Sequence, residues 1–311
     1  NCSVTGNTGM GANSNGGGMN IRHTYGGTVT INNGTYSNNT TAGIGGGIYI
    51  GGSEHISMSS VTIDGNSSTN ATAKGGGLTI TPLGVAGFTA NINISSTNIS
   101  NNVATTGVGE GGGIYFNSPY SATLTNCIIT GNSADIGAGV QNAGGTTGTI
   151  ILAISGSSIT NNVSLSAGGG LSHTGSVTTT TVTNCTITGN TTTGNGGGIY
   201  VAATDATGTV TLDGVTISSN TADFDNNGSG DGGGIYHSLG TLNLNNTITI
   251  GSSGNSNSAV NGGGIANVGG NLSKTSGLLT VANNIAKNHG GGLYITGGTI
   301  NFQKANIISN T

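Results

Sequence analysis

Short stretches of alternating apolar and polar residues recur along the chain, and each one follows a run of glycines. Examples are GIYI at 47–50, GIYF at 113–116, GIYV at 198–201 and GLYI at 292–295. An alternation with a period of two predicts a β-strand with one buried face. No stretch has the apolar spacing of an amphipathic helix, so the pattern predicts an all-β protein.

Two further short strands follow in each unit. The second is typified by GTVTI at 27–31 and GTVTL at 208–212, and the third ends in a turn, as in VTIDGN at 61–66 and NCTITGN at 184–190. Each unit therefore contains three predicted strands.

The glycine runs define the repeat. They divide the chain into ten units of about 30 residues, a period typical of solenoids. Stacked coils would pair each strand with its counterpart in the next coil, and parallel crossovers are overwhelmingly right-handed. We therefore expect a right-handed single-stranded parallel β-helix, a β-solenoid of about ten coils that forms one domain over residues 1–311. The runs begin at Gly16, Gly45, Gly75, Gly111, Gly137 (as Gly-Ala-Gly), Gly168, Gly196, Gly232, Gly262 and Gly290.

An asparagine ends the third strand of most units. It stands three residues after an apolar residue that is expected to point inward, for example Ile63 before Asn66 and Ile129 before Asn132. Asparagine tolerates left-handed backbone geometry, and stacked side-chain amides can bond to one another. The pattern predicts a structural asparagine ladder made of Asn66, Asn102, Asn132, Asn162, Asn190, Asn220 and Asn284.

The combination of Gly-Gly-x-Ile with a bulky apolar residue, two positions and then Asn resembles the repeats of chlamydial polymorphic outer membrane proteins and related bacterial surface β-helices of pectin-lyase-like fold. The resemblance covers nearly the whole chain, although Gly stands where that family often has Ala and Ile replaces its Phe. It implies the fold. It does not select a function, because this fold serves adhesins, polysaccharide lyases and hydrolases, and fibre proteins.

Charged residues are rare, at 5% of the chain with a formal net charge of −4. The only fixed cations are Arg22, Lys74, Lys274, Lys287 and Lys304. They form no basic patch for nucleic acid or an acidic membrane, and no apolar run reaches the roughly 20 residues of a membrane span. We therefore expect neither a nucleic-acid partner nor membrane insertion, and the scarcity of lysine and arginine favours an extracellular, cell-surface or secreted location.

The loop DFDNNGSGD at 223–231 carries the clearest chemical signal. Its oxygen-bearing residues follow the spacing of a calcium loop, with Gly228 at the sixth position. Gly234 stands where such a loop has its bidentate Glu, so an acidic solvated loop is the alternative. The predicted ligands are Asp223, Asp225, Asn227, Ser229 and Asp231. No cofactor is required by any other motif.

Tyrosines that follow the inward residue of the first strand are expected to line one outer face. They offer platforms for sugar rings, but β-propensity and covering of the sheet surface are the favoured explanation. These residues are Tyr49, Tyr115, Tyr200, Tyr236 and Tyr294. Outward threonine pairs such as Thr28 with Thr30 and Thr209 with Thr211 form a second face that could order water or ice, but threonine is also simply a good strand residue.

Catalytic and metal-binding patterns are weak elsewhere. His173 and His237 share a position in the repeat but are two coils apart, and His23, His55 and His289 match nothing. Cys2, Cys127 and Cys185 share another position and are expected to be free thiols that fill the interior. Among the carboxylates that an acid–base enzyme would need, no pair within one or two coils shares a column, and Asp64 and Asp213 lie in similar turns five coils apart. These carboxylates are Glu54, Asp64, Glu110, Asp135, Asp205 and Asp213.

The two ends of the sequence match each other. The chain begins in a third strand, NCSVTGN, and finishes in another, NIISNT, so that Ile308 aligns with Val4. We expect either continuation in a longer chain or end-to-end self-association. The sequence thus predicts a non-enzymatic structural module of a surface adhesin, stalk or filament. The alternatives are a carbohydrate-binding module that uses the tyrosine face and a polysaccharide lyase or hydrolase.

Overall fold

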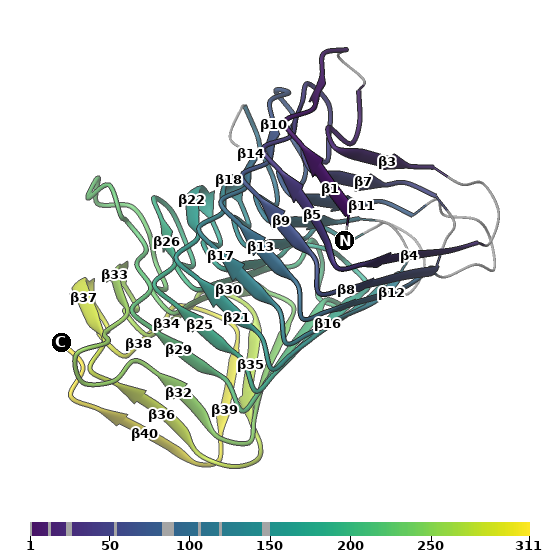
Figure 1. Ribbon diagram of the computed structural model, residues 1–311. Coiled ribbons are helices and arrows are strands. Elements are labelled where there is room, and N and C mark those ends of the chain that lie inside the picture. The colour runs from purple at the N-terminus through teal and green to yellow at the C-terminus, as the bar shows by residue number, and fades with distance from the viewer. Residues whose placement is uncertain are drawn as a thin grey trace.

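The computed structural model describes residues 2–11, 14–22, 27–52, 55–82, 90–104, 107–117, 120–144 and 150–311. The described chain is all-β and winds into a parallel β-solenoid of about nine turns with coils of roughly 30 residues. Figure 1 shows the coils stacked in chain order from one end to the other. Ten strands that follow glycine runs are separated by nine full turns, which accounts for the ten units counted in the sequence.

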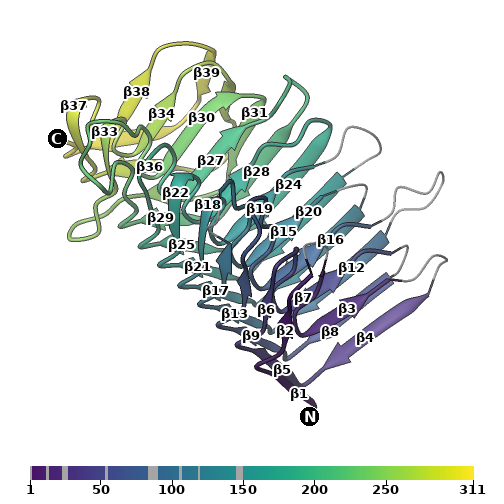
Figure 2. The same ribbon diagram turned by 90° about the horizontal axis from the view of Figure 1, so that it is seen from above.

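The coils visit the sheets in the same order (Figure 2). Three sheets take a single strand from each coil and run the length of the solenoid, and a fourth is formed by the earlier coils only. Sheet 1 has eleven strands and holds the strands that end in the asparagine turn. They are β1 (Cys2–Thr5), β5 (Gly34–Ser37), β9 (Thr62–Asp64), β13 (Asn98–Ser100), β17 (Ile128–Thr130), β21 (Ser158–Thr160), β25 (Thr186–Thr188), β29 (Thr216–Ser218), β32 (Ile248–Ile250), β36 (Leu279–Ala282) and β40 (Ala305–Ile308).

Sheet 2 has seven very short strands that follow the asparagine turn, and a separate two-stranded sheet lies in later coils. The seven are β2 (Thr8–Gly9), β6 (Thr40–Thr41), β10 (Ser67–Ser68), β14 (Val103–Ala104), β18 (Ser133–Ile136), β22 (Val163–Ala167) and β26 (Thr191–Thr192), and the separate pair is β33 (Ser258–Asn261) and β37 (Ile285–His289). Five of the seven strands have only two residues, which are too few to show an alternation, and the sequence pattern missed them.

Sheet 3 has ten strands, each directly after a glycine run. They are β3 (Met19–Ile21), β7 (Ile48–Ile50), β11 (Leu78–Ile80), β15 (Ile114–Phe116), β19 (Val140–Asn142), β23 (Leu171–His173), β27 (Ile199–Ala202), β30 (Ile235–Leu239), β34 (Ile265–Asn267) and β38 (Leu293–Ile295).

Sheet 4 also has ten strands and contains the longest ones. They are β4 (Thr28–Asn32), β8 (His55–Ser59), β12 (Ala90–Ser95), β16 (Tyr120–Thr125), β20 (Ile150–Ser155), β24 (Thr178–Thr183), β28 (Thr209–Asp213), β31 (Thr241–Asn245), β35 (Asn271–Lys274) and β39 (Thr299–Phe302). The described part of the chain contains no helix of the length and hydropathy that a membrane span requires.

One apolar core runs through the stack. The inward positions of sheet 1 are buried, as the spacing predicts, from Ile63 through Ile217 to Val281. Tyr36 and Ile250 occupy the same column, which the sequence pattern did not assign to them. Because every coil adds its own layer to the same core, the apolar surface of each coil is buried by its two neighbours rather than by folding back on itself.

The three glycines of each run have different structural roles. The first has a positive φ of 57 to 72° in all ten runs, a conformation that favours glycine. The second and third allow close approach of coils, since a Cβ on Gly197 would lie 2.6 Å from the carbonyl oxygen of Gly233 and one on Gly198 would lie 2.6 Å from that of Gly234. Ala138 fills a middle position next to a register shift between β18 and β22, where it packs with Ala134.

Candidate functional site

The asparagine ladder is the most regular polar feature of the interior. The Oδ1 atom of Asn162 accepts hydrogen bonds from the backbone N–H and the side-chain Nδ2 of Asn132, both at 3.0 Å. The Nδ2 of Asn162 donates onward to Asn190 at 2.9 Å and also to the carbonyl of Ile129 at 3.1 Å. Every polar atom of the buried amide is therefore satisfied, which is the condition for polar groups to lie in a core at little cost.

The ladder is longer than the seven predicted members. Asn39 and Asn257 make the same bonds. Asn310 accepts from Asn284 and donates to the carbonyl of Val281 at one end of the column, and Asn7 donates to Asn39 at the other. The sequence pattern missed Asn257 because this residue stands seven positions after the inward Ile250. The other members stand three positions after their inward residue. The continuous column runs through Asn7, Asn39, Asn66, Asn102, Asn132, Asn162, Asn190, Asn220, Asn257, Asn284 and Asn310.

A second polar column crosses the core at the end of the sheet 3 strands. Asn142, His173, His237 and Asn267 are all fully buried there, with Val201 between the two histidines. The imidazole of His173 lies between two hydroxyls, with Nδ1 2.9 Å from Thr180 Oγ1 and Nε2 2.9 Å from Thr178 Oγ1. The sequence placed the two histidines in one column but missed Asn142 and Asn267.

Burial makes both of these histidines weak bases. It lowers the pKa of His173 from 6.5 to about 4, with a smaller contribution from His237. Burial also lowers the pKa of His237, whose ring nitrogens make no hydrogen bond of normal geometry among the described residues. The described residues contain no group of three or more His, Cys, Asp or Glu side chains that could hold a metal ion. His23 lies outside the described residues.

The expectation of an open tyrosine face is wrong for two of its five members. Tyr49 is 7% exposed and Tyr115 is 5% exposed. Their rings are covered by cations, since the guanidinium of Arg22 lies 5.3 Å from the Tyr49 ring centre and the Lys74 ammonium lies 5.2 Å from that of Tyr115. Cation–π contacts of this kind explain why outward-pointing rings are nevertheless withdrawn from solvent.

The remaining tyrosines are only partly exposed and do not form a continuous row. Tyr200 and Tyr236 are neighbours in adjacent coils, with parallel rings whose centres are 5.3 Å apart. Ala266 separates them from Tyr294, which stacks on His289. Burial raises the pKa of Tyr200 and Tyr236. One pair of rings thus remains as an accessible aromatic surface.

The predicted calcium loop holds a different cation. The Asp223 side chain is fully buried, and its Oδ2 lies 2.6 Å from the Nζ of Lys287. Lys287 also donates to Asn226 Oδ1 at 2.8 Å, while the backbone N–H of Gly228 donates to Asp223 Oδ1. Burial raises the pKa of Asp223, but its bonds to Lys287 and Gly228 outweigh this effect and leave the pKa below its usual value.

The other predicted ligands serve different partners. Asp231 Oδ1 accepts from the backbone and side-chain amides of Asn261, and Asp225 accepts from Asn227. The backbone N–H of Ser229 donates to Asn227 Oδ1. Calcium binding by Asp223, Asp225, Asn227, Ser229 and Asp231 stays a prediction, and an ion would have to displace Lys287 from Asp223.

The carboxylates considered for acid–base chemistry are each engaged separately. Glu110 pairs with Lys74, and Asp64 accepts from Ser100 Oγ and Asn101 Nδ2. Asp213 accepts from Asn246, Asp205 from Thr207, and Asp135 from the backbone of Gly109. Glu54 lies outside the described residues.

The outward face of sheet 1 carries two rows made mostly of hydroxyl and amide side chains, which we call the hydroxyl face. Ile128 and Asp64 interrupt the rows, and Ser100 and Ser218 are buried. The parallel register fixes both rows along the solenoid. Row 1 consists of Ser3, Thr35, Thr62, Asn98, Ile128, Ser158, Thr186, Thr216, Thr249, Thr280 and Asn306. Row 2 consists of Thr5, Ser37, Asp64, Ser100, Thr130, Thr160, Thr188 and Ser218.

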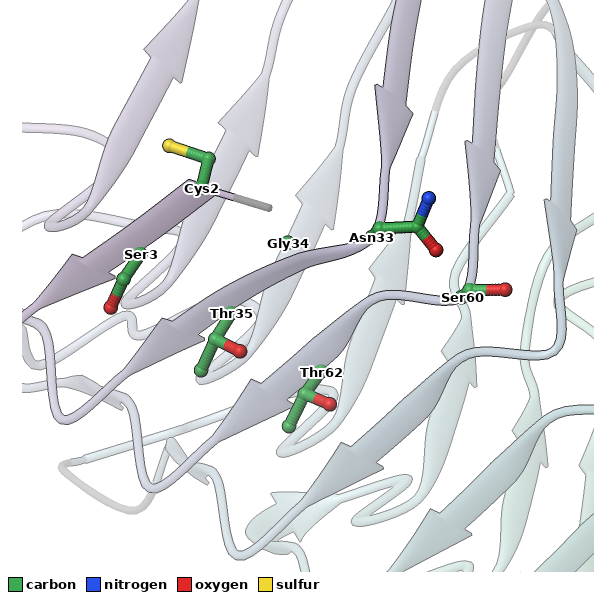
Figure 3. Close-up of a pocket in the computed structure, with 7 residues that line it drawn as sticks. All are labelled: Cys2, Ser3, Asn33, Gly34, Thr35, Ser60 and Thr62. Atoms are coloured by element: carbon green, nitrogen blue, oxygen red, sulfur yellow. The ribbon is translucent and has the colours of Figure 1, made fainter.

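A shallow pocket opens on this face near the N-terminal end. Figure 3 shows Ser3, Thr35 and Thr62 side by side on β1, β5 and β9, with Asn33 and Ser60 at the preceding corner. Cys2 and Gly34 complete the lining. Cys2 is exposed, unlike the buried Cys127 and Cys185, because no further described coil covers β1. All three thiols are free, and burial raises the pKa of Cys127 and Cys185.

The threonine pairs expected on sheet 4 do point outward, but they are interrupted. Ala153 stands between Thr123 and Thr181, and Asn243 follows Thr211. On sheet 1 the register places hydroxyl residues from five consecutive coils in each of two rows, a face that the sequence pattern did not single out.

No protein-family model, curated protein or solved structure matches the chain. The resemblance to bacterial surface β-helix repeats accordingly rests on the glycine and asparagine pattern itself.

Proposed function

We propose that the chain is a non-enzymatic structural β-solenoid that serves as the rod of an extracellular surface adhesin, stalk or filament. The observation that supports this most strongly is the ladder from Asn7 to Asn310, in which every coil is bonded to the next through a fully satisfied buried amide. The core is equally continuous. A stack built from equivalent, mutually bonded layers resists bending and allows length to be set by the number of coils.

The strands β1 and β40 are the two outer strands of sheet 1. The register places Ile307, not Ile308, in the column of Val4, because Val281 pairs with Ile307 and Asn310 continues the ladder three residues later. Sheet edges accept further parallel strands. Either another coil of a longer chain or a second copy would extend the same columns, and electron microscopy over a concentration series separates these two cases.

Removal of one complete coil tests the structural role. Deletion of residues 163–190 joins Asn162 to Thr191, so that Asn162 replaces Asn190 as the donor to Asn220. We expect a folded protein with an unchanged circular dichroism spectrum that is shorter by about 4.8 Å, one strand spacing. Deletion of 163–176 is the matched control, because it removes part of a coil and breaks the register. A complete-coil deletion that fails to fold while the chain itself folds would contradict modular stacking.

Glycan binding remains a second candidate because Tyr200 and Tyr236 form the one partly exposed stacked pair of the tyrosine set. Replacement of both by Ala should abolish retention on a glycan array if this role is correct. The matched control is replacement of the covered Tyr115 by Phe. A rod with no glycan binding leaves the structural proposal intact.

A further inference from the structure

We propose that the hydroxyl face of sheet 1 binds ordered water in the form of an ice surface. The inference concerns a surface separate from the ladder and the tyrosines, and it does not depend on the rod function.

The hydroxyl face is regular in two dimensions. Along each row, successive residues lie on neighbouring strands, which are about 4.8 Å apart, and the rows are separated by two residues of one strand, or roughly 6.6 Å. Row 1 contains an unbroken run of four threonines in consecutive coils, Thr186, Thr216, Thr249 and Thr280. An ice surface is itself a lattice of oxygens with a fixed repeat. Only side chains that keep a fixed repeat over several coils can bond many of its waters at once.

Some hydroxyls of this face are held in place by their neighbours, and others are available to bind water. In row 2, Thr160 bonds Thr130 at 3.0 Å and Thr188 lies 3.1 Å from Ser218 Oγ, so these side chains are fixed along the rod axis. In row 1, the hydroxyls of Thr186 and Thr216 have no protein partner among the described residues, and both side chains are exposed. Threonine is stiff about χ1, so little conformational entropy is lost when water binds.

The chemical composition of the face favours water as its ligand. Asp64 is the only charged residue in the two rows, and its carboxylate is already occupied by Ser100 and Asn101. No aromatic ring stands in either row, so the face lacks the stacking platforms that favour sugar rings. The pocket at the N-terminal end of the face is lined by hydroxyl and amide groups, the partners that hold an ordered water. A hydroxyl-rich lattice with a single charged residue favours water over a polysaccharide.

Adsorption of the purified chain to a growing ice surface, together with thermal hysteresis of its solution, tests the proposal. We expect the protein to concentrate in the ice and to depress the freezing point below the melting point. Thr186→Tyr and Thr216→Tyr should each abolish both effects, because a ring standing above the lattice holds the ice away. Thr216→Val, which keeps the shape of the side chain and removes the hydroxyl, should weaken them.

Thr204→Tyr is the matched control, since Thr204 is an exposed threonine in the segment between sheets 3 and 4. It should retain ice binding, and all variants should melt with the same thermal transition. The proposal is overturned if the unmodified protein enters ice no more than serum albumin does, or if Thr204→Tyr loses as much as Thr216→Tyr. Binding to insoluble cellulose or chitin without ice adsorption would assign the face to polysaccharide instead.

Discussion

Asn132 donates two hydrogen bonds to a single oxygen of Asn162 in the next coil, one from its backbone N–H and one from its side-chain amide. The same pair of bonds recurs between successive ladder members. Each corner that follows a sheet 1 strand is therefore hydrogen-bonded to the equivalent corner of the next coil.

Replacement of Asn162 by Ala should destabilise the solenoid. The change leaves both donors of Asn132 and the carbonyl of Ile129 without their buried partner. Buried groups left unsatisfied cost about 1–3 kcal/mol, so we expect the free energy of unfolding to fall by about that amount. Chemical denaturation measures it. Asn227→Ala, at an exposed loop asparagine, is the control, and an equal loss in both variants would contradict a special role for the ladder.

Mild acid should weaken the fold through His173. Its folded pKa of about 4 lies below the ordinary 6.5, so between these values the unfolded chain binds a proton that the folded chain excludes. The stabilisation is complete above pH 6.5 and is lost as the pH falls towards 4, at up to about 1.4 kcal/mol per pH unit.

His173→Asn is the informative variant for this pH dependence, because Asn142 and Asn267 already occupy the same column. It should reduce the slope of unfolding free energy against pH without eliminating it, since His237 is also buried as a weak base. An unchanged slope would show that His173 does not control the acid response.

Loss of Lys287 should loosen the loop at 223–231. Lys287→Met leaves the buried Asp223 carboxylate without its cation, and we expect a destabilisation of about 1–2 kcal/mol, less than for a fully buried pair because the Lys287 side chain is 46% exposed. Thermal melting measures this change. The double variant with Asp223→Asn should recover most of the loss.

Calcium should stabilise the Lys287→Met variant more than the unmodified protein. The ammonium that competes for Asp223 is then absent, and the oxygens of the loop are free to rearrange around an ion. Melting with and without millimolar calcium compares the two proteins. If calcium changes the melting temperature of neither protein, the prediction of a calcium site is wrong.

Gly197→Ala should be poorly tolerated although it adds only a methyl group. The new Cβ would lie 2.6 Å from the carbonyl oxygen of Gly233 in the next coil, and overpacking of this kind costs about 1–3 kcal/mol. Gly11→Ala, where nothing lies within 4 Å of the added atom, is the control. Equal melting temperatures for the two variants would show that the coils can separate to make room.

The sequence by itself determined the repeat, the β-solenoid and the inward columns. These follow from local patterns: an alternation marks a buried face, and a glycine or asparagine at a constant offset marks a corner. Stacking then brings equal positions together, so that Ile63 or Asn132 could be placed without knowledge of any distant contact.

Only the tertiary structure decided what lies beside an outward or irregular side chain. Tyr115 points outward as its position requires, yet Lys74 from the preceding coil covers its ring. Asp223 has the spacing of a calcium ligand, but the cation it binds is Lys287, two coils later. Such contacts depend on long, flexible side chains and on loops that depart from the repeat. The geometry of these contacts is set by neighbouring coils, so it cannot be predicted from a periodic sequence pattern.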